Sequence, residues 1–141
     1  MTTARQWVLA SRPEGAPASE NFRLEEVALP ELADGQILVQ NTFASVDPYM
    51  RGRMNDTKSY IEPFQIHQPL TGTAVGTVAE SRSEEFKVGD TVRHFAGWRT
   101  HAVLHEDQVE QIDTGIAPAE AYLGILGLTG LTAYVGLTAV G

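Results

Sequence analysis

The stretch Ala44-Ser45-Val46-Asp47-Pro48-Tyr49-Met50-Arg51-Gly52-Arg53-Met54 joins an apolar segment to a loop that crowds charge, proline and an aromatic ring together. The residues before it, 36–44, have the β-branched and aromatic content of a central strand. Pro48 has no N–H to donate, so a strand ladder ends there. We therefore expect a rigid strand that delivers a polar loop, and we interpret that loop as a site.

Composition places the chain among ordinary globular proteins. It has 141 residues, of which 43% are hydrophobic and 20% charged, enough for one domain with a real core. The formal net charge of -8 makes a nucleic-acid partner unexpected, because a polyanion would be repelled. The absence of cysteine excludes a disulfide framework and a thiolate nucleophile. The N-terminus lacks a signal-peptide pattern, so a cytoplasmic location is expected.

The order of apolar runs and turns predicts a mainly β fold. Several short strands follow one another with no helix between them, which excludes a doubly wound parallel sheet and favours a partly open β-barrel. Helix is expected only late, with a first helical turn at 118–120 and a second helix at about 131–140. We expect a domain at 1–118 and a helical segment at 119–141. The predicted strands cover 7–9, 22–29, 36–44, 70–80, 92–95, 100–104 and 109–112.

The segment 121–141 carries no charge and is long enough to span a bilayer. Its five glycines and three threonines, and the lack of basic flanks, argue against a membrane helix. We expect instead a helix that is buried or that contacts another domain.

Several motifs, read in order, carry a family resemblance. The run Val46-Asp47-Pro48-Tyr49-Met50-Arg51-Gly52-Arg53-Met54 resembles the signature of the zinc-independent medium-chain reductases, which include curcumin, prostaglandin and alkenal double-bond reductases. The resemblance extends over nearly the whole chain and is closest to the curcumin reductase branch. The further matching motifs are Trp7-Val8-Leu9-Ala10-Ser11-Arg12-Pro13, Asn21-Phe22-Arg23-Leu24, Ser59-Tyr60, Val88-Gly89-Asp90 and Gly130-Leu131-Thr132-Ala133-Tyr134-Val135-Gly136-Leu137.

The resemblance implies a GroES-like barrel that forms the first part of an NADPH-dependent enone or alkenal reductase. The nucleotide-binding Rossmann domain that follows in this family is not in the sequence, so it would supply most cofactor contacts from outside the chain. The full-length enzyme would act on a small-molecule substrate and form a homodimer. A quinone reductase and a stand-alone, co-chaperonin-like binding barrel remain the alternatives.

The resemblance also assigns roles to individual residues. Tyr60 is the expected catalytic residue, because a positioned phenol can stabilise or protonate the enolate that forms when hydride reaches an enone. Asp47 and Tyr49 are expected beside Tyr60 at the substrate. Tyr49, Met50 and Thr132 are expected to contact the cofactor.

Each of these residues also has a purely structural interpretation. Asp47 could fix a turn by accepting backbone N–H bonds, and Tyr49 could be a core anchor. Arg51 and Arg53 could hold a phosphate or carboxylate, but a structural pair with Asp47 or a nearby glutamate is the favoured interpretation.

Metal and phosphate sites are not expected in this chain. The family's zinc-containing relatives carry a loop cysteine and a Gly-His-Glu motif, whereas this sequence has Asp47 and Gly72-Thr73-Ala74. Three histidines can bind zinc, but on adjacent strands they are more often solvated or at the core edge. The run Gly124-Ile125-Leu126-Gly127-Leu128-Thr129-Gly130 lacks the spacing of a phosphate-binding turn, so its glycines are interpreted as allowing close packing. The three histidines are His94, His101 and His105.

Overall fold

The computed structural model describes residues 2–141, which form seven strands in two sheets. Strand β1 (Thr3–Leu9) pairs antiparallel with β2 (Phe22–Ala28), and the two form a hairpin. The connection between them ends in the 3-10 turn η1 (Ser19–Asn21). Strand β1 begins earlier than expected, because its polar first residues hide the strand pattern in the sequence.

The larger sheet has the strand order β6-β3-β4-β5-β7, and all of its pairs are antiparallel. Strand β3 lies between β4 and β6, and two register shifts in its pairing with β4 bend it. Gly76 permits that close pairing, because a Cβ there would collide with the carbonyl oxygen of Gln40. The strands are β3 (Gln36–Ala44), β4 (Ala74–Ser81), β5 (Thr91–His94), β6 (His101–His105) and β7 (Glu110–Gln111), with the 3-10 turn η2 (Glu106–Gln108) before β7.

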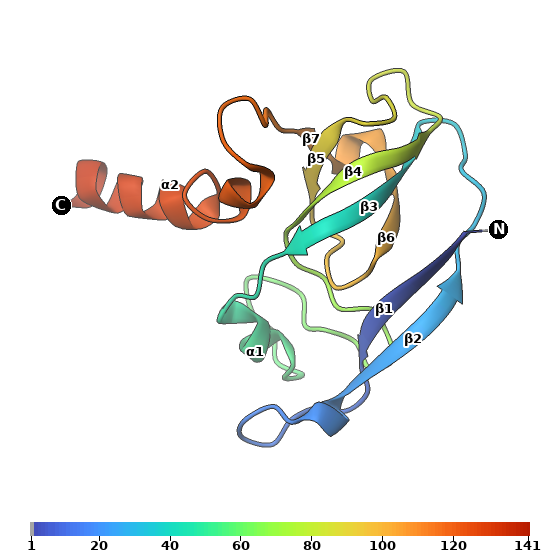
Figure 1. The fold of residues 1–141 in the computed structure, drawn as a ribbon. Helices are drawn as coiled ribbons and strands as arrows, with labels where there is room; N and C mark the ends of the chain where they lie inside the picture. The colour runs from blue at the N-terminus through green and yellow to red at the C-terminus, as the bar shows by residue number, and fades with distance from the viewer. Residues whose placement is uncertain (1) are drawn as a thin grey trace.

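The two sheets do not close on each other, so the predicted partly open barrel is confirmed. Backbone hydrogen bonds connect β1 to the neighbouring loops. Trp7 donates to the carbonyl of Trp98 at 2.9 Å and accepts from Leu70 at 2.9 Å. Figure 1 shows the β1–β2 hairpin beside the larger sheet, with helix α1 (Tyr49–Arg53) below the end of β3.

Helix α1 corrects the expectation that helix appears only late in the chain. Pro48 precedes it with φ -57 and ψ -33, the backbone conformation in which a helix begins. The proline ring fixes φ near this value, and the missing N–H is not needed in a first helical turn. The residue that ends the strand ladder therefore also starts a helix.

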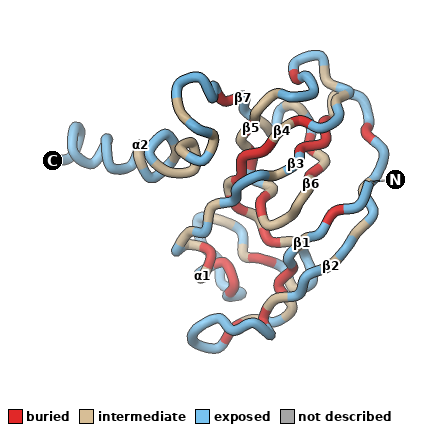
Figure 2. The backbone as a smooth tube through the Cα atoms, viewed as in Figure 1, coloured by how far each residue is buried: buried red, intermediate tan, exposed pale blue. Residues whose placement is uncertain are grey.

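The buried side chains form two clusters. One fills the inside of the larger sheet, and the other packs α1 against β1 and the following loop. Figure 2 shows buried residues in the first part of β3, in β4 and in α1. The first cluster contains Ile37, Val39, Val78, Phe86, Val92, Ala102 and Leu104; the second contains Leu9, Met50, Met54, Phe64 and Leu70.

The C-terminal segment is built differently. It contains the 3-10 turn η3 (Ala119–Leu123), helix α2 (Leu128–Val135) and the π-helical turn η4 (Gly136–Val140). Residues 113–141 include no buried position, and 131–141 are all exposed, so the helix is not buried within this chain. Figure 1 shows it projecting away from the sheets. Among the helices at 2–141, none combines the length and apolar character that crossing a membrane requires.

Candidate functional site

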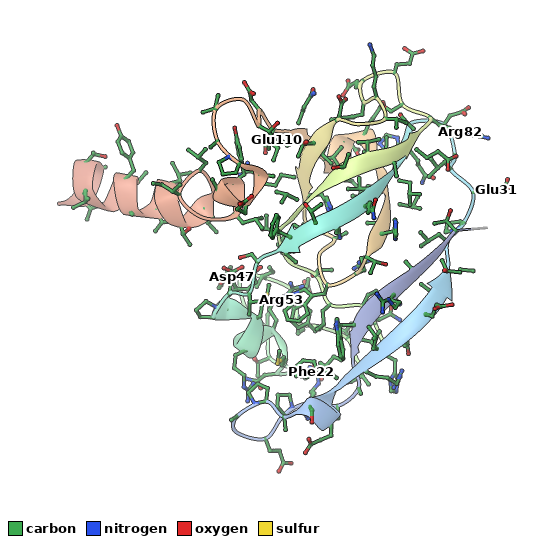
Figure 3. All side chains as sticks on the ribbon, viewed as in Figure 1. Phe22, Glu31, Asp47, Arg53, Arg82 and Glu110 are labelled. Atoms are coloured by element: carbon green, nitrogen blue, oxygen red, sulfur yellow. The ribbon has the colours of Figure 1, made fainter. Side chains whose placement is uncertain are left out.

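A cleft of about 880 Å³ lies between the start of α1, the loop before β4 and the C-terminal segment. Its lining is mostly apolar, and its ionisable residues other than tyrosine are Asp47 and Arg93. Figure 3 shows Asp47 where β3 leads into α1, facing the side of the molecule from which the C-terminal segment extends. The lining comprises Ser45, Asp47, Pro48, Tyr49, Tyr60, Ile61, Thr73, Arg93, Phe95, Tyr122, Leu123, Leu126, Gly127, Leu128, Thr129, Leu131, Thr132 and Ala133.

The cleft brings together four of the five residues that the sequence singled out. Asp47, Tyr49, Tyr60 and Thr132 all line it although they come from segments far apart in the chain. Met50 does not line it. Its side chain is 4% exposed and belongs to the second core cluster, and its sulfur accepts the backbone N–H of Asp47 at 3.5 Å.

The two cleft tyrosines that the sequence singled out, Tyr49 and Tyr60, differ in environment. Tyr49 is half-buried, and its pKa is raised by burial and by the charge of Asp47, while the nearby Arg53 cation opposes that rise. Its hydroxyl therefore keeps its proton at neutral pH and can donate a hydrogen bond. The Tyr60 side chain is 86% exposed and stands at the rim, in the irregular segment after α1.

Thr132 lines the cleft, but its hydroxyl already makes a hydrogen bond within α2. Its hydroxyl donates to the carbonyl of Leu128 one turn earlier in α2, at 2.7 Å. The expected contact of Thr132 with a cofactor stays a prediction, and so does that of Met50.

The two arginines of the motif are structural, but their partners differ from those expected. Arg51 donates to the carbonyls of Gly15 and Pro13 in the β1–β2 connection. Arg53 donates to the carbonyl of Glu62, not to its carboxylate, and to the hydroxyl of Thr71. The expected pairs with Asp47 or a glutamate are thus wrong, because both guanidinium groups donate to backbone carbonyls instead.

Arg93 and Phe95 line the cleft, and sequence reasoning missed both. Arg93 pairs with Glu110 at 2.5 Å and donates to the carbonyls of Tyr122 and Leu126, which ties the C-terminal segment to β5. A usable signal existed in the alternation along β5. Val92 and His94 are buried, so residues 93 and 95 face the other side of the strand.

The three histidines do not gather. His94 is 5% exposed; its Nε2 donates to the Asn41 side-chain oxygen at 2.7 Å, and its Nδ1 accepts the Ala96 N–H at 3.0 Å. Burial, with a smaller contribution from the Arg99 charge, lowers the pKa of His94 to about 4. Within residues 2–141, no group of three or more His, Cys, Asp or Glu side chains is arranged to hold a metal ion.

The glycine-rich run at 124–130 forms a tight turn and the first residues of α2 rather than a phosphate cradle. A Cβ at Gly127 would lie 2.5 Å from the Tyr122 carbonyl oxygen, and one at Gly130 would overlap the carbonyl of Ile125. At both positions the close neighbour is backbone of the same turn, so the interpretation that the glycines allow close packing of a helix or another domain stays a prediction.

A smaller groove of about 390 Å³ lies at the junction of the hairpin and the larger sheet, where Trp7, Phe43 and Trp98 meet. It contains none of the five residues predicted to act at the site. The chemistry therefore points to the larger cleft.

Comparison with known proteins agrees with this architecture. Residues 5–112 match the family model described as the N-terminal domain of oxidoreductase. The chain belongs to this family. The matched region ends at Ile112, which is also the last buried residue of the domain.

Relatives of this oxidoreductase N-terminal domain are named as reductases or oxidoreductases. The chain is 42% identical over 137 residues to the NADPH-dependent curcumin reductase of Escherichia coli, with 97% of the chain and 40% of that protein aligned. It is 48% identical over 142 residues to YfmJ of Bacillus subtilis, provisionally named an NADP-dependent oxidoreductase, with 100% of the chain and 42% of that protein aligned. The chain thus spans about two fifths of the length of these relatives.

A solved structure shows the same fold. The structure of CurA from Vibrio vulnificus in complex with NADPH superposes with a TM-score of 0.87 at 42% identity. The alignment covers 94% of this chain and 40% of CurA. The resemblance to the curcumin reductase branch, stated from the motifs, is confirmed.

Proposed function

We propose that this chain forms the substrate-binding part of an NADPH-dependent oxidoreductase that reduces the C=C bond of α,β-unsaturated ketones and aldehydes. The observation that carries the proposal is the convergence of Tyr49 and Tyr60 on one largely apolar cleft. An apolar cleft with a few placed hydrogen-bond donors suits a small apolar substrate that has one carbonyl group. The cytoplasmic location and the homodimer stay predictions.

The charge of the cleft favours a neutral substrate. Arg93 is already paired with Glu110, and Asp47 contributes a negative charge at the wall. A carboxylate or phosphate on the substrate would therefore meet repulsion from Asp47 and find no free cation among the cleft residues.

The same lining can take the uncharged reactive end of NADPH but not its phosphates. Tyr49 and Thr132 offer flat and apolar surfaces for a planar ring, whereas Arg93 is occupied and the turn at 124–130 leaves no cradle. This agrees with the expectation that the phosphates are held outside this chain. NADPH, when bound, supplies the hydride.

Tyr60 and Tyr49 of this chain donate hydrogen bonds to the carbonyl oxygen of the substrate. Negative charge builds there as the β-carbon accepts hydride, and the Tyr60 hydroxyl donates a hydrogen bond and then its proton to the enolate oxygen. The resulting enol tautomerises to the saturated carbonyl compound, and the exposed Tyr60 regains a proton from water. Tyr49, whose raised pKa keeps it protonated, supplies a second donor from the motif Val46–Met54 that precedes Tyr60. The apolar walls around the half-buried Tyr49 strengthen its hydrogen bond, whereas Tyr60 acts from the exposed rim.

The test replaces Tyr60 by phenylalanine in the full-length enzyme and follows NADPH oxidation with an enone. Tyr134→Phe is the matched control, because Tyr134 is also exposed but lies outside the cleft. We expect Tyr60→Phe to lower kcat/KM by about 10²-fold, the scale for a general acid, and to leave the NADPH Kd unchanged. Equal turnover in both variants would reject the role of Tyr60. Faster turnover of a quinone than of the enone would favour a quinone reductase instead.

A further inference from the structure

Arg53 is the last residue of α1 and is 8% exposed, although it carries a positive charge. Its Nε donates to the carbonyl of Glu62 at 2.8 Å, and its Nη1 donates to the Thr71 hydroxyl at 2.9 Å. The guanidinium lies over the ring of Phe64, 4.0 Å from its centroid, and the backbone carbonyl of Arg53 accepts from the Phe64 N–H at 2.7 Å. Figure 3 shows Arg53 on the inner side of α1, toward the body of the domain.

These contacts hold one segment in particular. Tyr60 lies between Met54, which directly follows α1, and Glu62, the first residue that Arg53 binds. The segment 54–61 has no regular secondary structure, and residues 55–60 are exposed. One side chain thus fastens the far end of the loop that carries Tyr60 to the helix that carries Tyr49.

Arg53 also lies behind one residue of the cleft wall. Its guanidinium carbon lies 5.7 Å from the centroid of Phe95, which lines the cleft. Among the described residues 2–141, no carboxylate forms an ion pair with Arg53. No ion pair within these residues neutralises its charge. That charge lowers the pKa of Tyr49, whereas burial and the charge of Asp47 raise it. A neutral side chain would fill this space without the cost of burying an unpaired cation.

We propose that Arg53 is a positioning residue for the reduction, which holds the Tyr60 segment against α1 so that Tyr49 and Tyr60 reach the same carbonyl oxygen. The inference rests on the proposed function for its catalytic consequence. Its structural part, the fastening of the loop, does not depend on what the enzyme reduces.

The decisive variant is Arg53→Lys in the full-length enzyme. Lysine keeps the charge but loses the planar fork that binds Glu62 and Thr71 together and stacks on Phe64. Arg51→Lys is the matched control, because Arg51 lies on the same helix and binds carbonyls of the β1–β2 connection instead. We expect kcat for an enone to fall about 10- to 10²-fold in Arg53→Lys, on the scale of a misplaced catalytic group, and to change less than about 2-fold in Arg51→Lys.

A double variant separates positioning from general damage. If Arg53 acts through Tyr60, then Arg53→Lys adds little further loss in a Tyr60→Phe background, because the hydroxyl it positions is already gone. Fully additive losses would show that Arg53 acts elsewhere and would overturn the proposal.

Two measurements need no turnover. Amide hydrogen exchange at residues 55–63 should speed up in Arg53→Lys and stay as in the wild type in Arg51→Lys. The titration of Tyr49 should move to higher pH in Arg53→Met, which lacks the cation, and not in Arg53→Lys. Unchanged exchange in Arg53→Lys would overturn the inference whatever the activity. Faster exchange in an enzyme that does not reduce enones would reject the proposed function alone and keep the fastening role.

Discussion

The sheet body and the C-terminal segment of this chain are both rich in apolar residues, yet they use them in opposite ways. Ile37, Val39 and Val92 in the body have no exposed surface, whereas Leu128, Leu137 and Val140 in the tail are 74%, 80% and 83% exposed. The body therefore stabilises itself, and the tail contributes one wall of the cleft without a core of its own. Apolar content alone does not say which segments pack.

The largest expected effect is a core truncation in the body. Ile37→Ala should lower the free energy of unfolding by about 2–5 kcal/mol, because Ile37 is fully buried in the first core cluster and the change leaves a cavity. Leu137→Ala in the tail should change it by less than about 0.5 kcal/mol. Urea denaturation of both variants measures the difference. Similar losses in the two would mean that the tail is packed in solution.

A pH effect of about 3 kcal/mol is expected from His94. Its pKa is about 4 in the fold against an ordinary 6.5, so the unfolded chain binds the proton more tightly. This contribution to stability is fully present above about pH 6.5, falls as the pH drops, and is lost below about pH 4.

The measurement compares unfolding free energies across this pH range in the wild type, in His94→Gln and in the control His101→Gln, whose histidine is half-buried at the sheet edge. The slope between pH 6.5 and 4 should flatten only in His94→Gln. A slope that survives in His94→Gln would assign the pH dependence to the carboxylates.

Two glycine-to-alanine substitutions should have opposite effects, destabilising the sheet body at Gly76 and favouring helix in the tail at Gly136. Gly76→Ala places a Cβ against the Gln40 carbonyl of β3, which cannot move without breaking the β3–β4 pairing, so a loss of about 1–3 kcal/mol is expected. Gly136→Ala meets nothing within 4 Å and lies in helical backbone, so it should raise helicity of the tail. Thermal unfolding reports the first change and far-UV circular dichroism the second.

These contrasts also show what the sequence could and could not predict. Alternation and turn residues located the strands, although β1 begins earlier than they predicted. Gly89, with φ 96, has the backbone of a turn between β4 and β5. Helix α1 was missed because Pro48 was read only as the end of a strand, although the same fixed φ starts a helix. Five residues of helix are too short for a periodicity signal.

The site was predictable where the motif carried it and not where the fold assembled it. The placement of Asp47, Tyr49, Tyr60 and Thr132 in one cleft followed from the resemblance. The alternation along β5 puts Arg93 and Phe95 on one face, but it does not show that this face lines a cleft. The partners of Arg51 and Arg53 could not be foreseen, because a backbone carbonyl anywhere in the fold competes equally with a carboxylate. The residue type predicts the charge of a side chain, but the packing of the fold decides which group it hydrogen-bonds to.

The smallest expected effect on folding stability comes from removing 128–141. The two core clusters lie between Leu9 and Leu104, and Arg93 holds the C-terminal segment through carbonyls no later than Leu126, so a chain ending at Gly127 keeps every one of these contacts. We expect its unfolding free energy to differ by less than about 0.5 kcal/mol from that of the whole chain.

Association should change far more, because apolar surface left in water costs about 25 cal/mol per Å² and the exposed face of α2 offers such surface to a second copy. Analytical ultracentrifugation of the 141-residue chain should show concentration-dependent association that the shorter chain lacks. Leu131→Gln with Leu137→Gln, which keeps the helix but not its apolar face, should behave like the shorter chain. A 141-residue chain that stays monomeric at all concentrations would mean that the tail covers its own leucines, and the contrast between body and tail would then be smaller than the exposed fractions indicate.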